Sequence, residues 1–276
     1  MASKIRTILS TSGFASGSGF ACTKMKIQYV SDLHLEFFGS SSKQYIKNIK
    51  NKGCDVCIVP GDIGYPHDDY YIDFLDHMSK TFDQTFIVPG NHEYYQSKKI
   101  NKNMEEIDEY MNDLFDEYDN ISLLNNKIEK YGGFNFIGTT MWSKITDPRW
   151  KINDVKYIKG LGTTKYNELH HKSVDFLNKA IEMVDGKTII ITHHMPSYDL
   201  IHPKYKQSYA KYNQWFYADM NEFIGKYDSK INCWFYGHTH IPLVQKIGKI
   251  PTLCNPIGYP NENNSQNIDF NRLYTT

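Results

Sequence analysis

Five short segments of this chain carry histidine, aspartate or asparagine at close spacing, and each follows, or nearly follows, an apolar run. They are Asp32-Leu33-His34, Gly61-Asp62, Gly90-Asn91-His92-Glu93, His193-His194 and Gly237-His238-Thr239-His240. Carboxylate and imidazole groups delivered from the ends of several strands converge on one rim of a sheet. Such a cluster can hold two divalent metal ions about 3.5–4 Å apart, the arrangement that serves in-line phosphoryl displacement.

The spacing inside two of these segments has a structural meaning. Residues two apart point to the same side of an extended segment, so Asp32 with His34, and His238 with His240, can reach one site. Imidazole and carboxylate together suit Mn, Fe, Zn or Co better than Ca. The glycines at 61, 90 and 237 permit tight turns and a close backbone approach where a strand opens into a loop.

Apolar runs that would position these residues alternate with amphipathic segments in the first half of the chain. Strands are expected at 27–30, 56–59 and 85–88, and helices at 42–52, 69–82 and 94–118. This alternation predicts an α/β domain with its site at the carboxyl ends of the strands. The second half adds expected strands at 121–124, 127–131, 134–140, 188–191, 231–236, 243–247 and 250–253, and a helix at 164–184.

The composition is that of one large globular domain. The chain has 276 residues, of which 40% are hydrophobic and 22% charged. Its 31 basic and 31 acidic residues cancel, so net charge indicates no attraction to nucleic acid or to an anionic membrane, although a local basic groove stays open. No apolar run approaches the ~20 residues that span a bilayer. Five unevenly spaced cysteines, Cys54-x-x-Cys57 among them, favour reduced thiols and a cytoplasmic location.

Residues 1–24 differ from the rest. They are rich in Ser and Gly, contain Lys4, Arg6 and Lys24, and lack acidic residues. Such a start can be a transit peptide, an upstream extension or a remnant of an added leader. We expect a disordered N-terminal tail or leader at 1–24 and the folded domain at 25–276.

Taken in order, the five segments resemble the calcineurin-like metallophosphoesterase superfamily, whose pattern reads D-x-H, G-D, G-N-H-[DE], H and G-H-x-H. The resemblance spans roughly residues 25–260. The stretches 31–37 (SDLHLEF) and 254–260 (CNPIGYP) are similar to its small single-domain branch. This resemblance implies a four-layer α/β/β/α sandwich with two mixed sheets.

The resemblance also implies a role for each motif residue. Asp62 would bridge two metals, with Asp32, His34 and His240 at the first and Asn91, His193 and His238 at the second. The residues implied in catalysis are His92, Asp62 and Asp32. His92 would protonate or stabilise the leaving oxygen with support from Asp32, or else would orient Asn91. The family takes the first histidine of a pair such as 193–194 as ligand, which leaves His194 at the rim or behind a ligand.

The implied reaction is attack of a metal-bridged hydroxide on a phosphodiester or a small phosphorylated metabolite. Two divalent ions (Mn, Fe, Zn, Co, Ni or Mg) would be the cofactors. The arginines of the protein phosphatase pattern, G-D-x-x-D-R-G and R-G-N-H-E, are missing here, so phosphoprotein is not the expected substrate.

Two alternatives to this reaction stay open. The same site could serve a nuclease or a cyclic-nucleotide phosphodiesterase. A non-catalytic scaffold would be expected to have lost metal ligands, and all of them are present. We therefore expect a small-molecule or nucleotide phosphoester as partner and no membrane, with nucleic acid possible but not indicated by net charge.

Two further segments could touch substrate. Asn153-Asp154 follows a loop with Trp and Lys, and would either contact substrate or cap a helix or turn. The segment 198–217 interleaves aromatic residues with lysines, and would either stack a base and neutralise a phosphate or form a partly packed lid.

Overall fold

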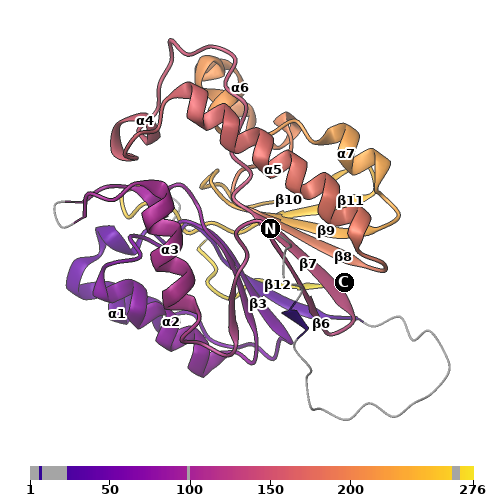
Figure 1. The fold of residues 1–276 in the computed structure, drawn as a ribbon. Helices are drawn as coiled ribbons and strands as arrows, with labels where there is room; N and C mark the ends of the chain where they lie inside the picture. Colours follow the sequence, from indigo (N-terminus) through magenta and orange to yellow (C-terminus); the bar gives the residue numbers. More distant parts are fainter. Residues whose placement is uncertain (1–5, 8–23, 98–99, 263–267) are drawn as a thin grey trace.

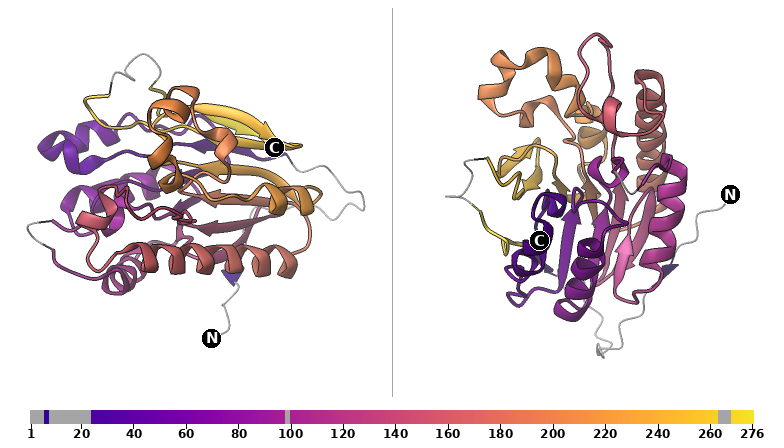
Figure 2. Two further views of the ribbon diagram at one scale, coloured as in Figure 1. Left: turned by 90° about the horizontal axis from the view of Figure 1, so that it is seen from above. Right: turned by 90° about the vertical axis from the view of Figure 1, so that its left-hand side faces the viewer.

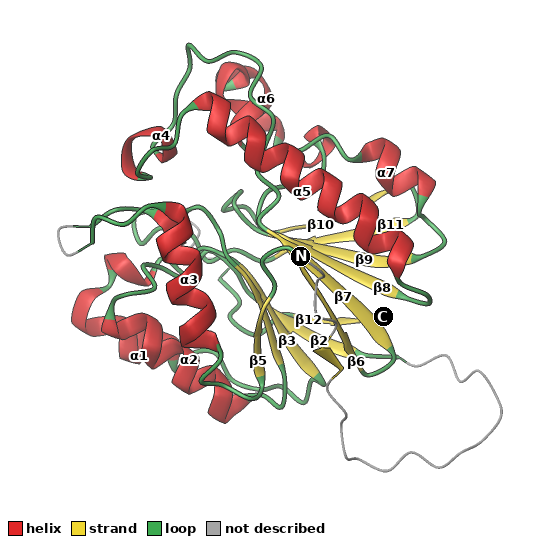
Figure 3. Cartoon of the chain, viewed as in Figure 1, coloured by secondary structure: helices red, strands yellow, loops and turns green. Residues whose placement is uncertain are grey.

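Four layers make up the part of the chain that the computed structural model describes, residues 6–7, 24–97, 100–262 and 268–276 (Figure 1). Two mixed sheets pack face to face in the middle, and helices cover the outer face of each sheet (Figures 2 and 3). The predicted α/β/β/α sandwich is therefore confirmed.

The smaller sheet contains the first three motif-bearing strands. Its order is β12-β2-β3-β4-β5, with β2 to β5 parallel and β12 antiparallel to β2. Every residue of β3 is buried, as expected where helices cover one face of a sheet and a second sheet covers the other. The strands are β2 (Lys26–Tyr29), β3 (Val56–Pro60), β4 (Thr85–Val88), β5 (Ile121–Leu123) and β12 (Leu273–Thr275).

The larger sheet contains the other two motif-bearing strands, β8 and β9, at its centre. Its order is β1-β6-β7-β8-β9-β11-β10, and the predicted hairpin of β10 and β11 pairs Ile247 with Ile250. The strands are β1 (Arg6–Thr7), β6 (Lys127–Tyr131), β7 (Phe134–Thr139), β8 (Thr188–Thr192), β9 (Ile231–Tyr236), β10 (Leu243–Ile247) and β11 (Ile250–Cys254).

Strand alternation divides the core into three apolar layers. In β3, Val56 and Ile58 pack between the sheets, whereas Cys57 and Val59 pack under the helices. The sheets meet through rings such as Phe86 of β4 and Phe136 of β7, which stack with centroids 4.1 Å apart. The described cysteines are free thiols, and burial raises the pKa of Cys57 well above its usual value.

Helices α1, α2 and α3 cover the smaller sheet, and α5 and α7 cover the larger one (Figure 1). The short α4 and α6 lie beyond the N-terminal end of α5. The helices are α1 (Ser42–Ile46), α2 (Asp69–Thr81), α3 (Met104–Phe115), α4 (Asp154–Tyr157), α5 (Thr163–Met183), α6 (Pro203–Ser208) and α7 (Asn221–Lys226). Five 3-10 turns are η1 (Leu35–Phe37), η2 (Gly39–Ser41), η3 (His92–Tyr94), η4 (Tyr198–Leu200) and η5 (Ala210–Trp215). None of the described helices is both long and apolar enough to cross a bilayer.

Two predicted helices were too long. The helix predicted at 94–118 begins only at Met104, because Asn103 and Glu106 form a reciprocal capping box that fixes its start. The surface helix predicted at 42–52 ends at Ile46. The predicted disordered tail lies outside the described residues, apart from Lys24 and from Arg6–Thr7, which pair with β6.

Gly138 of β7 lies where the two sheets approach closely. A Cβ there would overlap Leu124 Cβ and would lie 2.9 Å from Val88 Cγ2. We predict that Gly138→Ala lowers the free energy of unfolding by about 1–3 kcal/mol, the usual cost of overpacking a core. Thermal unfolding of both proteins measures this. Gly225→Ala in α7, where a Cβ meets nothing within 4 Å, is the matched control and should not lower Tm. An unchanged Tm for Gly138→Ala would show that the sheets can separate without cost.

Candidate active site

All five motifs lie just beyond the ends of parallel strands. Asp32 and His34 follow β2, Asp62 follows β3, and Asn91 and His92 follow β4. His193 follows β8, and the segment 238–240 follows β9. Because the two sheets pack face to face, these ends meet at one seam between them, and the motifs come together as predicted.

The backbone at this seam is strained. Seven described residues other than glycine have positive φ, and five of them are motif residues. They are Asp32 (φ 53°), His34 (47°), Asp62 (55°), His238 (67°) and His240 (45°). Such residues cost of order 1–3 kcal/mol each and persist where a function holds them. A Cβ on Gly90 would overlap Asp62 Oδ1, so Gly90 must stay a glycine for Asp62 to keep its place.

One group of donors consists of Asp32, His34, Asp62 and His240, whose ligand atoms lie within 4.8 Å of one another. Asp62 Oδ2 lies 3.7 Å from His34 Nε2, and Asp32 Oδ1 lies 3.6 Å from His240 Nε2. Backbone amides hold both carboxylates: His92 N donates to Asp62 Oδ1 and His238 N donates to Asp32 Oδ1, each at 2.9 Å.

A second group consists of Asp62, His193 and His238, with Asn91 beside it. Asp62 Oδ2 lies 3.4 Å from His193 Nε2, and Asn91 Oδ1 lies 2.9 Å from the same nitrogen. His238 Nε2 is buried with no hydrogen-bond partner among the described residues. Asp62 therefore faces both groups through one oxygen.

The surroundings of the histidine rings define which nitrogen carries the proton. His34 Nδ1 lies 3.1 Å from Glu36 Oε1, and His240 Nδ1 lies 2.7 Å from Glu262 Oε2. Since both Nδ1 atoms donate to carboxylates, the two Nε2 atoms carry lone pairs, yet they face each other at 2.9 Å. Two acceptors at that distance need positive charge between them.

The second group repeats this arrangement. His193 Nδ1 donates to the carbonyl oxygen of Pro60 (2.8 Å), and Asn91 Nδ2 donates to Asp154 Oδ1 (2.8 Å). His193 Nε2 and Asn91 Oδ1 are then facing acceptors. Burial lowers the pKa of His193, but the Asp62 carboxylate outweighs it and raises that pKa to about 10. The same field attracts a divalent cation, which competes with the proton, so these residues fit a metal.

His92 has a different partner from the one predicted. Its Nδ1 lies 2.7 Å from Glu36 Oε1, so the expectation that Asp32 supports this imidazole is wrong. Asp32 instead accepts hydrogen bonds from Ser31 and from the backbone of His238. Burial lowers the pKa of His92, but the Asp62 and Glu36 carboxylates raise it to about 9.

The chain reversal at η1 explains the contact between Glu36 and His92. Leu35–Phe37 form one 3-10 turn directly after His34, and this turn places Glu36 beside the His92 ring. Glu36 lies inside the quoted stretch 31–37, yet no role for it was foreseen. Only the turn geometry reveals that one carboxylate oxygen serves both His34 and His92.

Two further acidic residues orient the site and were not predicted. Buried Glu93 accepts hydrogen bonds from the backbone amides of Asp62 (3.1 Å), Ile63 (2.8 Å) and Gly90 (2.7 Å). Glu262 accepts from His240 Nδ1 and from the amide of Tyr259. Glu93 stands in the G-N-H-E motif and could have been found, whereas nothing in the local sequence marks Glu262.

Three histidines outside the two donor groups are either buried or line the cavity. His194 is buried behind the second group, with Nε2 3.0 Å from the Tyr166 hydroxyl and its ring 4.3 Å from that of His238. Burial and the neighbouring His193 lower the pKa of His194 to about 3. His202 lines the cavity described below, and His170 lies on the buried face of α5.

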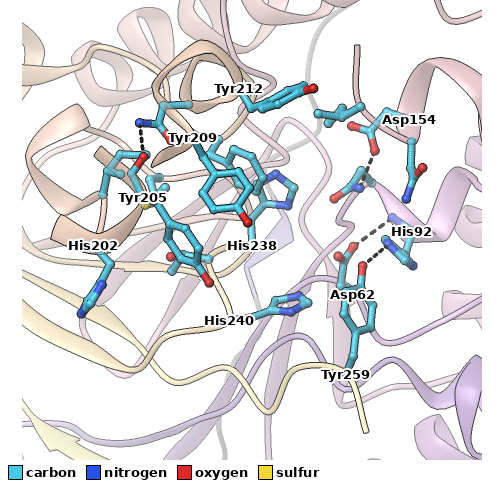
Figure 4. A pocket seen from close by; sticks show the side chains of 18 of the residues that line it. Asp62, His92, Asp154, His202, Tyr205, Tyr209, Tyr212, His238, His240 and Tyr259 are labelled. Atoms are coloured by element: carbon cyan, nitrogen blue, oxygen red, sulfur yellow. Dashed lines mark hydrogen bonds between the residues drawn. The ribbon is translucent and has the colours of Figure 1, made fainter. Parts of the chain in front are cut away.

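A cavity of about 500 Å³ opens over both groups. Asp154 lines it but acts through Asn91, Tyr95 and Tyr166, whose side chains donate to its carboxylate. Asn153 is the residue before α4, but its side chain makes no capping hydrogen bond. Figure 4 shows Tyr205, Tyr209 and Tyr212 on one side of the cavity, facing His92 and Tyr259 on the other. The segment 198–217 therefore lines one side of the cavity.

Comparisons with known proteins agree with this site. Residues 25–242 match the family described as calcineurin-like phosphoesterase. Uncharacterized protein L509 of Acanthamoeba polyphaga mimivirus is 30% identical over 277 residues, which cover 90% of this chain and 97% of that protein.

Two solved structures share the fold. Phosphopantetheinyl hydrolase (PptH) from Mycobacterium tuberculosis superposes with a TM-score of 0.71 at 18% identity, covering 93% of this chain and 97% of that chain. The protein TT1561 of Thermus thermophilus gives a TM-score of 0.54 at 12% identity, covering 85% of this chain and 90% of that chain. The family match includes all five motifs and the buried Asp/His cluster that fits a divalent metal. The chain therefore belongs to the calcineurin-like phosphoesterase family and is a metal-dependent phosphoester hydrolase.

Proposed function

We propose that this protein is a dimetal phosphoesterase that hydrolyses a phosphodiester or a small phosphorylated metabolite. The observation that carries the proposal is the pair of donor sets that share Asp62. In one set the acceptors of His34 and His240 face each other, and in the other those of Asn91 and His193 do. When the rings are neutral, each pair needs a proton or a metal ion between its acceptors, so each donor set can take a metal ion of its own in place of a proton, which supports two metals.

Asp32, His34 and His240 would hold the first ion, and Asn91, His193 and His238 the second, with Asp62 reaching both. Divalent ions there supply Lewis acidity toward a phosphoryl oxygen and make water a better nucleophile at neutral pH. The hydrogen bonds of Glu36, Glu262 and Asp154 orient the ligands before metal arrives, as partners of metal-bound groups usually do. Imidazole and carboxylate donors suit Mn, Fe, Zn, Co or Ni, with Mg also possible.

His92 would protonate the leaving group. Its Nδ1 is held by Glu36, so Nε2 faces the cavity, where the Tyr259 hydroxyl oxygen lies 3.1 Å away. An oxygen of substrate can therefore lie within hydrogen-bond distance of Nε2. The hydrogen bond to Glu36 favours the protonated ring, so His92 would carry the proton that an alkoxide needs at neutral pH.

The charges around the cavity favour a monoanionic phosphate. Apart from histidines, Lys151 is the one basic side chain among the described residues that line it, and no arginine is among them. A phosphomonoester dianion usually meets an arginine clamp that binds it in a bidentate manner. A diester carries one charge fewer and needs no such clamp. Because PptH is described as a phosphopantetheinyl hydrolase, a phosphopantetheinyl ester belongs in the substrate screen.

We predict that turnover requires divalent metal. Chelation should abolish hydrolysis of bis(p-nitrophenyl) phosphate, and adding back Mn, Co, Ni, Zn or Mg should restore it. The screen should also include a phosphomonoester, a cyclic nucleotide and single-stranded DNA, with diesters turned over fastest. Full activity in a sample shown by elemental analysis to be metal-free would contradict the dimetal mechanism.

Asp62→Asn should reduce metal content as well as rate, because only Asp62 faces both donor groups. We expect fewer than two ions per chain by elemental analysis and a loss of kcat of at least about 10²-fold, as expected when metal-assisted catalysis is impaired. Asp219→Asn, at an exposed position outside the cavity, is the matched control and should keep wild-type values. Two tightly bound ions in Asp62→Asn would rule out the bridging role.

His92→Ala should lose more rate on an alkyl or nucleoside ester than on a nitrophenyl ester. General acid assistance is worth typically 10²–10⁴-fold, and it matters most for a poor leaving group. The measurement is kcat/KM on both ester types together with metal content, which should stay near that of wild type. His171→Ala, an exposed change in α5, is the control. Equal losses on both esters would point to charge stabilisation instead, and loss of metal would make His92 a ligand or its support.

A further inference from the structure

One half of the cavity has no part in the proposed hydrolysis. It is formed by the segment 198–217, whose rings of Tyr205, Tyr209, Tyr212 and Phe216 line the cavity. Figure 4 shows the three tyrosines opposite His92. We call these four rings the aromatic wall. Phe216 joins the wall to the site, since its ring lies 4.7 Å from that of His238 at an angle of 30°.

The aromatic wall is built on a fixed base. Gln214 Oε1 accepts from the amides of Thr146 and Asp147, both at 2.8 Å, and its Nε2 donates to the Asp147 carbonyl at 2.9 Å. The fully buried Trp215 donates from Nε1 to the Trp150 carbonyl at 2.6 Å. The loop before α4 thus fixes the C-terminal part of the segment that carries the wall, which reduces the ordering that Phe216 needs when a ligand binds.

Tyr209 presents a large ring that the protein itself leaves uncovered. It lines the cavity, yet 53% of it is exposed. Its neighbour Tyr205 packs against it in a T-shaped arrangement, with centroids 5.7 Å apart and an angle of 72°. An exposed aromatic face beside an active site is available to stack a planar group.

Two lysines that do not line the cavity lie over rings of this part of the molecule. Lys204 Nζ lies 4.6 Å from the centre of the Tyr205 ring, and Lys211 Nζ lies 5.3 Å from that of Tyr212 and 3.8 Å from that of Trp150. Aromatic rings combined with basic side chains are the means by which proteins bind nucleotides without reading the base edge. A cavity of about 500 Å³ is within the size range of small-ligand sites.

We infer that the aromatic wall stacks a nucleobase, so that the substrate is a nucleotide phosphoester whose phosphate lies at the metal site. This inference rests on the proposed function for the place of the phosphate, and it adds the substrate class. Tyr209 is then a specificity-determining residue, and stacking should not depend strongly on which base is present, since every base has a π-face.

Two ligands that differ only in the base provide the test. The methyl esters of adenosine 5′-monophosphate and of ribose 5-phosphate are diesters that share sugar and phosphate, and their Kd values are measured by calorimetry on the Mn-loaded protein. We expect the nucleotide to bind about 5- to 150-fold more tightly, since stacking on an aromatic side chain is worth about 1–3 kcal/mol. Tyr209→Ala should bring the ratio close to one, and Tyr209→Phe should preserve it. Tyr198→Ala, at a 40% exposed position outside the cavity lining, is the matched control.

The possible failures are distinct. Similar Kd values for the two ligands on the wild-type protein would overturn the inference, as would a Tyr209→Ala protein that keeps the ratio. The inference would also be overturned if 4′-phosphopantetheine bound more tightly than the nucleotide and Tyr209→Ala removed that advantage. The aromatic wall would then bind a flexible chain and not a base. These binding measurements do not depend on turnover, whereas the proposed function fails if no phosphoester is hydrolysed with any metal. Tyr209→Leu, which keeps apolar bulk but not the ring, should behave as Tyr209→Ala and guards against an uninformative folding defect.

Discussion

Atoms that accept hydrogen bonds when their rings are neutral lie opposite one another inside this protein, at distances that only a proton or a metal cation between them can satisfy, and the arrangement of the site follows from that constraint. Buried acceptors without a partner are costly, and two of them at hydrogen-bond distance also repel. Hydrogen bonds on the far side of each group fix this arrangement. Glu262 accepts the Nδ1–H of His240, the Pro60 carbonyl accepts that of His193, and Asp154 accepts an amide proton of Asn91. Each of these outer contacts makes the inner atom a stronger ligand. Metal ions bound at this seam would therefore stabilise the folded protein as well as supply chemistry.

One carboxylate oxygen links a proposed metal ligand, His34, to the proposed proton donor, His92. Glu36 Oε1 accepts from His34 in one donor group and from His92 outside it. Burial raises the pKa of Glu36, but the two imidazole hydrogen bonds hold it below its usual value. A change of charge at His34 is therefore felt by His92 across one carboxylate. Binding of metal and the readiness of the proton donor are electrostatically coupled, although the two rings belong to different motifs.

Much of this could be predicted from the sequence, because the ligands are tied to strand ends. Asp62 and His193 follow apolar runs that can only be buried strands, and strand ends in packed sheets converge. The partner of His92 could not be predicted, since it depends on how tightly η1 turns after His34. Glu262 reaches His240 from a loop 22 residues further on, and no local pattern marks such a contact. The late start of α3 could have been found, because Asn103-x-x-Glu106 is a capping box that apolar periodicity alone passes over.

The left-handed backbone at five motif residues has an evolutionary consequence. Each of these positions is occupied by an aspartate or histidine in a conformation that glycine or asparagine adopts at less cost. The strain is tolerated only while the side chain is needed. In a lineage released from selection for activity, replacements at these turns would stabilise the protein, so the catalytic residues would be the first to be lost and the fold would outlive them.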